Sequence, residues 1–88
     1  MDPLPAAPSA VDVAEVFLTS RGYRDEAGLR LRWYRGEWYG YDGRVFAPIA
    51  SEELRAEIMA FLHSTRAREK AKRSFVGDVV GNLEGFCR

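Results

Sequence analysis

The chain has 88 residues, of which 47% are apolar and 12% aromatic, a size that suits one packed domain and argues against two. Thirteen basic and thirteen acidic residues give a formal net charge of zero, which argues against a general polycation that coats nucleic acid. The longest apolar runs are far shorter than the roughly 20 residues that cross a bilayer, and no secretory leader is recognisable, so we expect no membrane segment and a cytoplasmic location.

Cys87 is the only cysteine, so the chain cannot form an internal disulfide. No spacing of His, Cys, Asp and Glu resembles a set of metal ligands. We therefore expect a reducing compartment, no metal and no cofactor.

The N-terminal segment, residues 1–8, contains three of the four prolines and no periodic apolar pattern. Such a segment is typical of a flexible arm, which we expect can be removed without loss of stability. The remaining residues, 9–88, are expected to form a single small domain.

A first helix is predicted over residues 10–20. Ser9 followed by Asp12 has the spacing of a helix N-cap with an acid three positions later, and apolar residues then recur on one helical face. The helix should stop at Gly22, and residues 23–28 are expected to form a charged connector.

A three-stranded antiparallel meander is predicted over residues 29–49, which combine β-favouring side chains, period-two alternation and two turn signals. Strands are expected at residues 29–34, 37–41 and 44–47, with Pro48 ending the third. So small a sheet needs a hydrophobic partner, which the flanking helices supply.

The two turns set the register of this sheet. Asp42-Gly43 is typical of a two-residue hairpin turn, because both residues tolerate positive φ. In the first turn Arg35 stands where a two-residue turn favours Asn or Asp, so we expect a three-residue turn with Gly36 in the left-handed position.

On this register Tyr39 lies opposite Phe46, and Arg32 lies opposite Trp38. The buried face is then expected to carry Leu29, Leu31, Trp33, Tyr39, Tyr41 and Phe46, and the exposed face Arg30, Arg32, Tyr34, Trp38 and Val45. A slip of one residue in the first turn would exchange Trp38 and Tyr39 between the faces.

Two more helices follow. Ser51 with Glu52 and Glu53 predicts an N-cap and a first turn that complements the helix dipole, and apolar residues recur on one face up to Leu62. A third apolar period begins at Phe75. Its apolar face either closes this core or packs on a segment outside this chain, and we expect the chain to be a piece of a longer protein.

The elements together predict an α+β domain in the order α-β-β-β-α-α, with the small sheet packed on the first two helices. Residues 66–73, between the last two helices, hold five basic residues against one acid, a local charge of +5 − 1 = +4. This basic link is the strongest charge run in the chain.

The meander and the helix after it follow a fixed order: a basic-aromatic strand, Gly, Trp-Tyr, an aromatic residue, Asp-Gly, an apolar strand and an acid-capped helix. This pattern resembles a segment of phage and plasmid primase-helicases of the poxvirus and satellite-phage type. The residues that carry the resemblance are Arg32–Tyr34, Gly36, Trp38, Tyr39, Tyr41, Asp42, Gly43, Phe46 and Ser51–Leu54. Phe46 stands where the family's third strand often has a tryptophan.

The resemblance, which spans residues 10–86, implies a non-catalytic accessory module of a replication protein, next to a primase or helicase domain. The chain has no GxxxxGK[ST] phosphate loop and no paired-acid or zinc-ligand primase pattern, so neither nucleotide hydrolysis nor primer synthesis is assigned to it. His63, the single histidine, has no nucleophile or metal partner in the pattern and is interpreted as a boundary residue.

The module is expected to contact single-stranded DNA or to organise the adjoining helicase. Contact with DNA is preferred over catalysis, because arginines meet phosphates while aromatic rings stack on unpaired bases. The candidate contact residues are Arg30, Arg32, Tyr34, Arg35, Trp38 and Arg44 on the meander, and Arg66, Arg68, Lys70, Lys72 and Arg73 in the basic link.

Two alternatives stay open. Arg32 can lie over Trp38 as a cation–π pair that only shields the sheet, and the basic link can be a solvated run. The exposed rings or the third helix can also dock a protein, in which case the chain is a stand-alone adaptor or regulator that binds another protein and no DNA.

Overall fold

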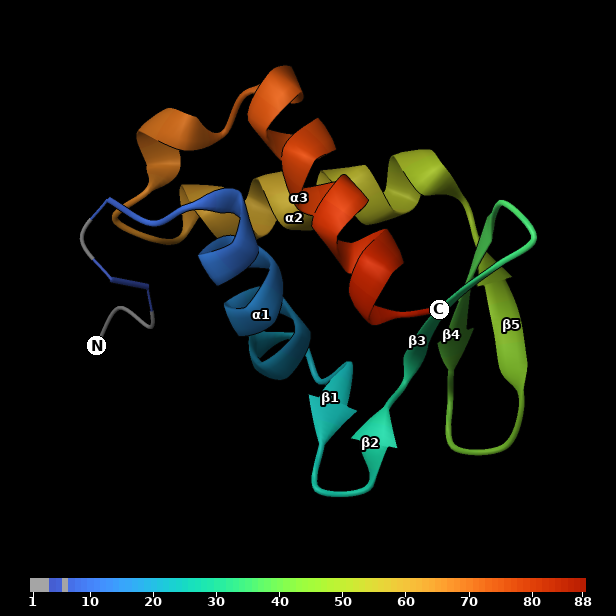
Figure 1. Ribbon diagram of the computed structural model, residues 1–88. Helices are drawn as coiled ribbons and strands as arrows, with labels where there is room; N and C mark the ends of the chain where they lie inside the picture. The colour runs from blue at the N-terminus through green and yellow to red at the C-terminus, as the bar shows by residue number, and fades with distance from the viewer. Residues whose placement is uncertain (1–3, 6) are drawn as a thin grey trace.

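The structure, a computed structural model, describes residues 4, 5 and 7–88 and has a mixed α+β fold (Figure 1). In chain order the elements are α1 (Ala10–Ser20), β1 (Arg24–Asp25), β2 (Gly28–Leu29), β3 (Leu31–Tyr34), β4 (Glu37–Tyr41), β5 (Phe46–Ile49), α2 (Ser51–His63), the 3-10 turn η1 (Arg68–Lys70) and α3 (Arg73–Phe86). The predicted α+β class and the order of its main elements are confirmed. One element is added, because the expected connector forms the antiparallel hairpin β1–β2.

α1 begins where the sequence predicts, because Ser9 and Asp12 form a capping box. The Ser9 backbone N–H donates to Asp12 Oδ2 at 2.9 Å, and the Asp12 N–H donates to Ser9 Oγ at 3.2 Å. The buried face of α1 consists of Val13, Ala14, Phe17 and Leu18. The helix ends at Ser20, and Gly22, whose φ is +76°, then turns the chain toward the sheets.

α2 and α3 complete a layer of three helices, in which α3 packs against both α1 and α2 (Figure 1). Their buried side chains are Leu54, Ile58, Phe61 and Leu62 of α2 and Val76, Val79, Val80 and Leu83 of α3. Thus α3 closes this core. Ser51, the expected N-cap, lies inside α2, and Ala50 takes the N-cap position without a side-chain hydrogen bond. Within the described residues, none of these helices is long and apolar enough to span a membrane.

The register of β3 on β4 differs by one residue from the prediction. Trp33 lies opposite Trp38, and only two residues, Arg35 and Gly36, connect the strands. Both have positive φ, +50° and +77°, as a type I′ turn requires. The predicted three-residue turn is therefore wrong. Because side chains alternate along a strand, the slip moves Trp38 into the core, where it is 1% exposed, and places Tyr39 on the opposite face.

The turn between β4 and β5 is longer than the predicted two-residue hairpin. Tyr41 lies opposite Phe46, so four residues form the loop. Asp42 Oδ1 accepts the backbone N–H groups of Arg44 at 2.8 Å and Val45 at 3.0 Å, so both donors are satisfied within the loop. Tyr41 and Phe46, both expected in the core, lie on the outer face because the slip of β4 on β3 reverses the faces of β4, and Phe46 pairs with Tyr41.

The two edges of the three-stranded sheet are blunted. On the β3 side, the Trp33 N–H donates to Cys87 O at 2.9 Å, so the end of α3 contacts this edge. On the β5 side, Pro48, which was expected to end the strand, lies within it and opposite Tyr39. The Tyr41 N–H donates to Arg30 O, toward β3, and because hydrogen bonds alternate along a strand, Tyr39 also bonds toward β3. Pro48, opposite Tyr39, therefore forms no hydrogen bond with β4, and its nitrogen, which has no hydrogen, faces the open edge. Addition of another strand is disfavoured there.

The β1–β2 hairpin stands beside this sheet (Figure 1). Asp25 Oδ1 accepts the Ala27 N–H at 2.8 Å and stabilises its tip, and the Arg30 N–H donates to Tyr23 O at 2.6 Å where the chain passes into β3. Leu29, expected in the core as part of the first strand, belongs to β2 and is 37% exposed. The core assignment of Leu29 is therefore wrong.

The N-terminal segment contributes to the core. Leu4 is 3% exposed and belongs to the hydrophobic cluster, and Pro8 is also buried. These two residues correct the expectation of an arm without packing contacts. The expectation for residues 1–3 and 6 lies outside the described residues.

Candidate nucleic-acid interface

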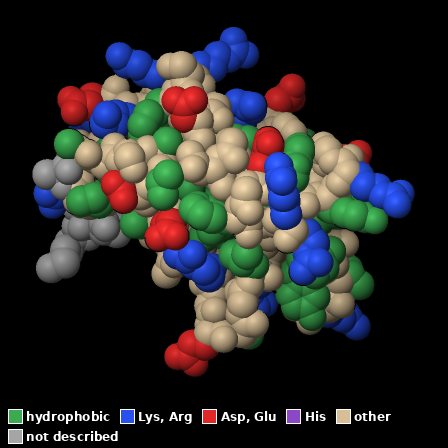
Figure 2. All heavy atoms as spheres, viewed as in Figure 1, with side chains coloured by type: hydrophobic (Ala, Val, Ile, Leu, Met, Phe, Trp, Pro, Cys, Tyr) green, Lys and Arg blue, Asp and Glu red, His purple; other side chains and the backbone are tan. Residues whose placement is uncertain are grey.

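The outer face of the three-stranded sheet is rich in aromatic rings and arginine. On the side opposite Trp38, the register places Arg32 and Tyr34 of β3, Tyr39 and Tyr41 of β4, and Phe46 of β5. We call these five residues the ring face. Tyr34 is 54% and Phe46 is 40% exposed. In Figure 2, hydrophobic side chains lie next to Lys and Arg where β3–β5 lie in Figure 1.

Three arginines lie over rings of this face. The Cζ-to-centroid distances are 5.8 Å for Arg30 over Tyr41, 5.2 Å for Arg32 over Phe46 and 5.2 Å for Arg35 over Tyr34. The cation–π pair considered from the sequence, Arg32 over Trp38, is not formed, because Arg32 lies over Phe46 instead. A guanidinium that lies on a ring still has donors at its rim, so this arrangement is compatible with binding a phosphate.

Arg30 and Arg32 differ in their carboxylate partners. Arg30 Nε donates to Asp25 Oδ2 at 2.9 Å. The pKa of Asp25 is lowered, first by the hydrogen bond from the Ala27 N–H and then by that from Arg30. In the described part of the chain, Arg32 has no carboxylate within ion-pair distance. The charge of Arg32 is therefore available to an anion, whereas that of Arg30 is partly neutralised by Asp25.

Glu37 gives one end of the ring face a negative charge. The Tyr39 hydroxyl donates to Glu37 Oε2 at 2.8 Å, and this hydrogen bond raises the pKa of Tyr39. Because a carboxylate repels phosphate, a nucleic-acid backbone is favoured closer to Arg32 than to Glu37.

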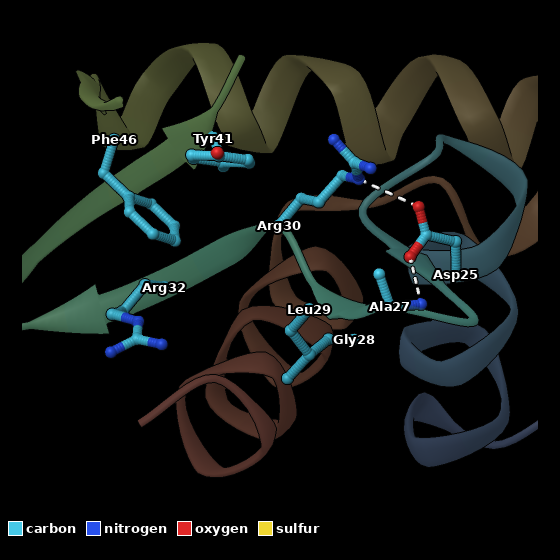
Figure 3. A pocket seen from close by; sticks show the side chains of 8 residues that line it. All are labelled: Asp25, Ala27, Gly28, Leu29, Arg30, Arg32, Tyr41 and Phe46. Atoms are coloured by element: carbon cyan, nitrogen blue, oxygen red, sulfur yellow. Dashed lines mark hydrogen bonds and ion pairs between the residues drawn. The ribbon is translucent and has the colours of Figure 1, made fainter. Parts of the chain in front are cut away.

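A hollow of about 250 Å³ lies between the ring face and the β1–β2 hairpin (Figure 3). It is lined by Asp25, Ala27, Gly28, Leu29, Arg30, Arg32, Tyr41 and Phe46. The rings of Tyr41 and Phe46 are 5.1 Å apart between centroids and tilted by 43°, so they present two apolar surfaces at an angle. The hollow thus combines ring surfaces with the guanidinium of Arg32.

Trp38 is withdrawn from the candidate contact residues. Its ring packs against that of Trp33 at 4.8 Å between centroids, and it cannot stack on a base without leaving the core. The other candidates of the meander lie on or beside the ring face: Arg30, Arg32, Tyr34, Arg35 and, in the exposed β4–β5 loop, Arg44.

Sequence reasoning missed Tyr39, Tyr41 and Phe46 as surface residues. All three depend on the register, which the prediction placed one residue away at the first turn. Arg35-Gly36 was the available signal, since a two-residue connection with Gly in second place fits a type I′ turn once the arginine accepts positive φ.

The basic link is separate from the ring face. Arg66, Arg68, Lys70, Lys72 and Arg73 lie between α2 and α3 or at the start of α3. Arg66 and Arg68 follow the last residue of α2, whereas β5 precedes its first, and a 13-residue helix spans roughly 20 Å. Lys70 Nζ lies 5.2 Å from the Phe75 ring centroid. The structure therefore divides the predicted contact residues into two groups.

Other reactive groups do not converge on the ring face. His63 is exposed at the end of α2. Burial raises the pKa of the Cys87 thiol to about 11. Among the described residues, no group of three or more His, Cys, Asp and Glu side chains is placed to hold a metal ion.

Comparisons of the chain with protein-family models, with curated proteins and with solved structures find no match. The similarity to primase-helicases stays a prediction from the sequence pattern. The ring face has to be interpreted from its own chemistry.

Proposed function

We propose that the ring face binds single-stranded DNA. The observation that supports this is the position of Arg32, which has no carboxylate partner in the described residues and lies among four aromatic rings. Unpaired bases stack on aromatic side chains, and arginine binds phosphate through paired N–H donors. In a duplex the bases are already stacked on one another, so rings on a sheet offer them little.

We expect the affinity for single-stranded DNA to depend only modestly on salt concentration. Arg32, Arg35 and Arg44 can neutralise up to three phosphates, and each contributes about −0.7 to the log–log salt slope for a single strand, so the slope should be about −2. Stacking contributes about 1 to 3 kcal/mol per base and does not depend on salt in this way. Base stacking should therefore supply much of the affinity.

We further propose that the domain serves as a non-catalytic accessory module of a replication protein of the primase-helicase type. The support is the sequence pattern of the meander and the second helix, together with a surface suited to a displaced strand. The test is the natural reading frame: continuation past residue 88 into a GxxxxGK[ST] phosphate loop would support this role.

Docking of a protein partner is the second candidate. Val45 and Phe46 are adjacent apolar residues that are 60% and 40% exposed, which suits a small protein contact. The blunted edges of the sheet disfavour strand addition, so such a partner would have to cover the ring face. This candidate is favoured if the domain fails to bind DNA.

Fluorescence anisotropy with a labelled dT12 oligonucleotide and a 12-base-pair duplex tests DNA binding. We expect the single strand to bind more tightly. Tyr34→Ala should weaken binding to dT12 by about 1 to 3 kcal/mol, or roughly 5- to 150-fold, because it removes an exposed stacking ring. Tyr34→Phe keeps the ring and is the matched control, with affinity expected within about twofold of the unaltered protein. Absence of binding to dT12 at low salt would exclude the proposal.

A further inference from the structure

The ring face carries a second hollow, of about 330 Å³, which is lined by Arg32, Tyr34, Tyr39 and Phe46. Arg32 and Phe46 line this hollow as well as the one beside the β1–β2 hairpin. The two hollows are therefore neighbours with a common wall. Tyr41 belongs to the first, and Tyr39 belongs to the second.

The guanidinium of Arg32 lies at this common wall. Arg32 starts on β3 opposite Tyr39, whereas Phe46 lies on β5 opposite Tyr41. Arg32 Cζ is 5.2 Å from the Phe46 ring centroid, so the guanidinium of β3 and the ring of β5 meet on the ring face, although β4 lies between their strands. Figure 3 shows Arg32 and Phe46 at the same side of the first hollow, away from the Arg30–Asp25 ion pair.

We infer that the two hollows hold two consecutive bases of one strand and that Arg32 binds the phosphate between them. The inference rests on the proposed function and specifies how the strand lies. Tyr39 and Tyr41 are two residues apart on β4, which places them about 7 Å apart along the strand. One extended sugar–phosphate unit spans such a step, with its phosphate over the common wall.

The other arginines are less suited to this position. Arg30 is held by Asp25, and neither Arg35 nor Arg44 lines either hollow. Arg35 lies in the β3–β4 turn, over Tyr34, and Arg44 lies in the β4–β5 loop, so neither lies at the common wall of the two hollows. Arg44 is therefore the matched comparison: an exposed arginine near the same face that lacks the central position.

Anisotropy titrations of dT12 with the full chain compare Arg32→Ala with Arg44→Ala. Arg32→Ala should weaken binding roughly tenfold or more and lower the salt slope by about 0.7, because one charge-assisted phosphate contact is lost. Arg44→Ala removes only a contact to a phosphate outside the two-base step, so it should weaken binding clearly less than Arg32→Ala does. Arg32 is exposed, so both variants should keep the melting temperature of the unaltered protein, and Arg32→Lys, which retains the charge, should recover part of the affinity.

A dinucleotide with a neutral linkage isolates the central phosphate. Thymidine dinucleotide should compete with dT12 more strongly than its methylphosphonate analogue, by roughly fivefold, and Arg32→Ala should abolish this preference. The two-base step is overturned, while DNA binding stands, if the domain binds dT12 but Arg32→Ala and Arg44→Ala weaken that binding equally. The same holds if the two dinucleotides compete equally well with dT12 for the unaltered protein. If dT12 does not bind at low salt, both proposals fall.

Discussion

Trp38→Ala is the most direct test of the sheet register. Trp38 is 1% exposed and contacts Trp33 in the core, so its truncation leaves a large cavity. A tryptophan buries roughly 150 to 250 Å², and at about 25 cal/mol per Å² this corresponds to roughly 4 to 6 kcal/mol. Because Ala retains part of that burial, the expected loss in the free energy of unfolding is about 3 to 5 kcal/mol. This is a large share of the about 5 to 15 kcal/mol that stabilises a typical domain.

Urea unfolding measured by far-UV circular dichroism gives the loss directly. The chain has two tryptophans, so the variant leaves Trp33 as the single fluorescent reporter of the same transition. If Trp38→Ala is unfolded in buffer, Trp38→Phe keeps an aromatic ring in the core and should give a measurable transition with a smaller loss.

Trp33→Ala is the comparison that decides between the two registers. Trp33 is only half-buried, so its truncation should cost less than that of Trp38. The register predicted from sequence requires the reverse order, because it places Trp33 in the core and Trp38 outside. A larger loss for Trp33→Ala would refute the observed pairing.

Two further predictions concern the ends of the chain. Leu4→Ala should lower the free energy of unfolding by about 1.5 to 3 kcal/mol, whereas Pro5→Ala, at an exposed neighbour, should leave it nearly unchanged; equal urea midpoints would show that Leu4 makes no stabilising contact. Burial raises the pKa of the Cys87 thiol from 9.0 to about 11, so the folded state favours the protonated thiol. The resulting contribution to the free energy of unfolding is fully present below pH 9 and is lost as the pH rises through 11. Between pH 9 and 11, the free energy of unfolding of Cys87→Ala should therefore fall less than that of the unaltered protein. At pH 8, an aromatic disulfide reagent should modify Cys87 much more slowly in the native protein than in the urea-unfolded protein. Equal rates would contradict its burial.

The helices were predictable because their signals are local. The bonds between Ser9 and Asp12 join residues three positions apart, and the apolar period of each helix fits within a few turns. Only the N-cap of α2 was misplaced, by one residue, which is the usual uncertainty of a helix end. The α+β class followed from the alternation of these segments with the aromatic strands.

The faces of the sheet were not predictable in the same way, because they depend on a balance between a local cost and a distant gain. Positive φ at Arg35 costs about 1 to 2 kcal/mol, which local rules count against a two-residue turn. Burial of Trp38 against Trp33 and the helices stabilises the same turn by about 3 to 5 kcal/mol, but this gain exists only in the packed fold.

For the same reason, only part of the candidate site could be predicted from the sequence. The arginines of the meander were identified from composition, since a charged side chain in a short amphipathic strand is usually exposed whatever its register. Tyr39, Tyr41 and Phe46 were assigned to the core because an aromatic ring suits either face, and only pairing decides which. The burial of Leu4 also depends on tertiary contacts. Its proline-rich neighbours exclude a helix. Whether a single apolar side chain in an irregular segment is buried is then decided by the parts of the chain that pack beside it.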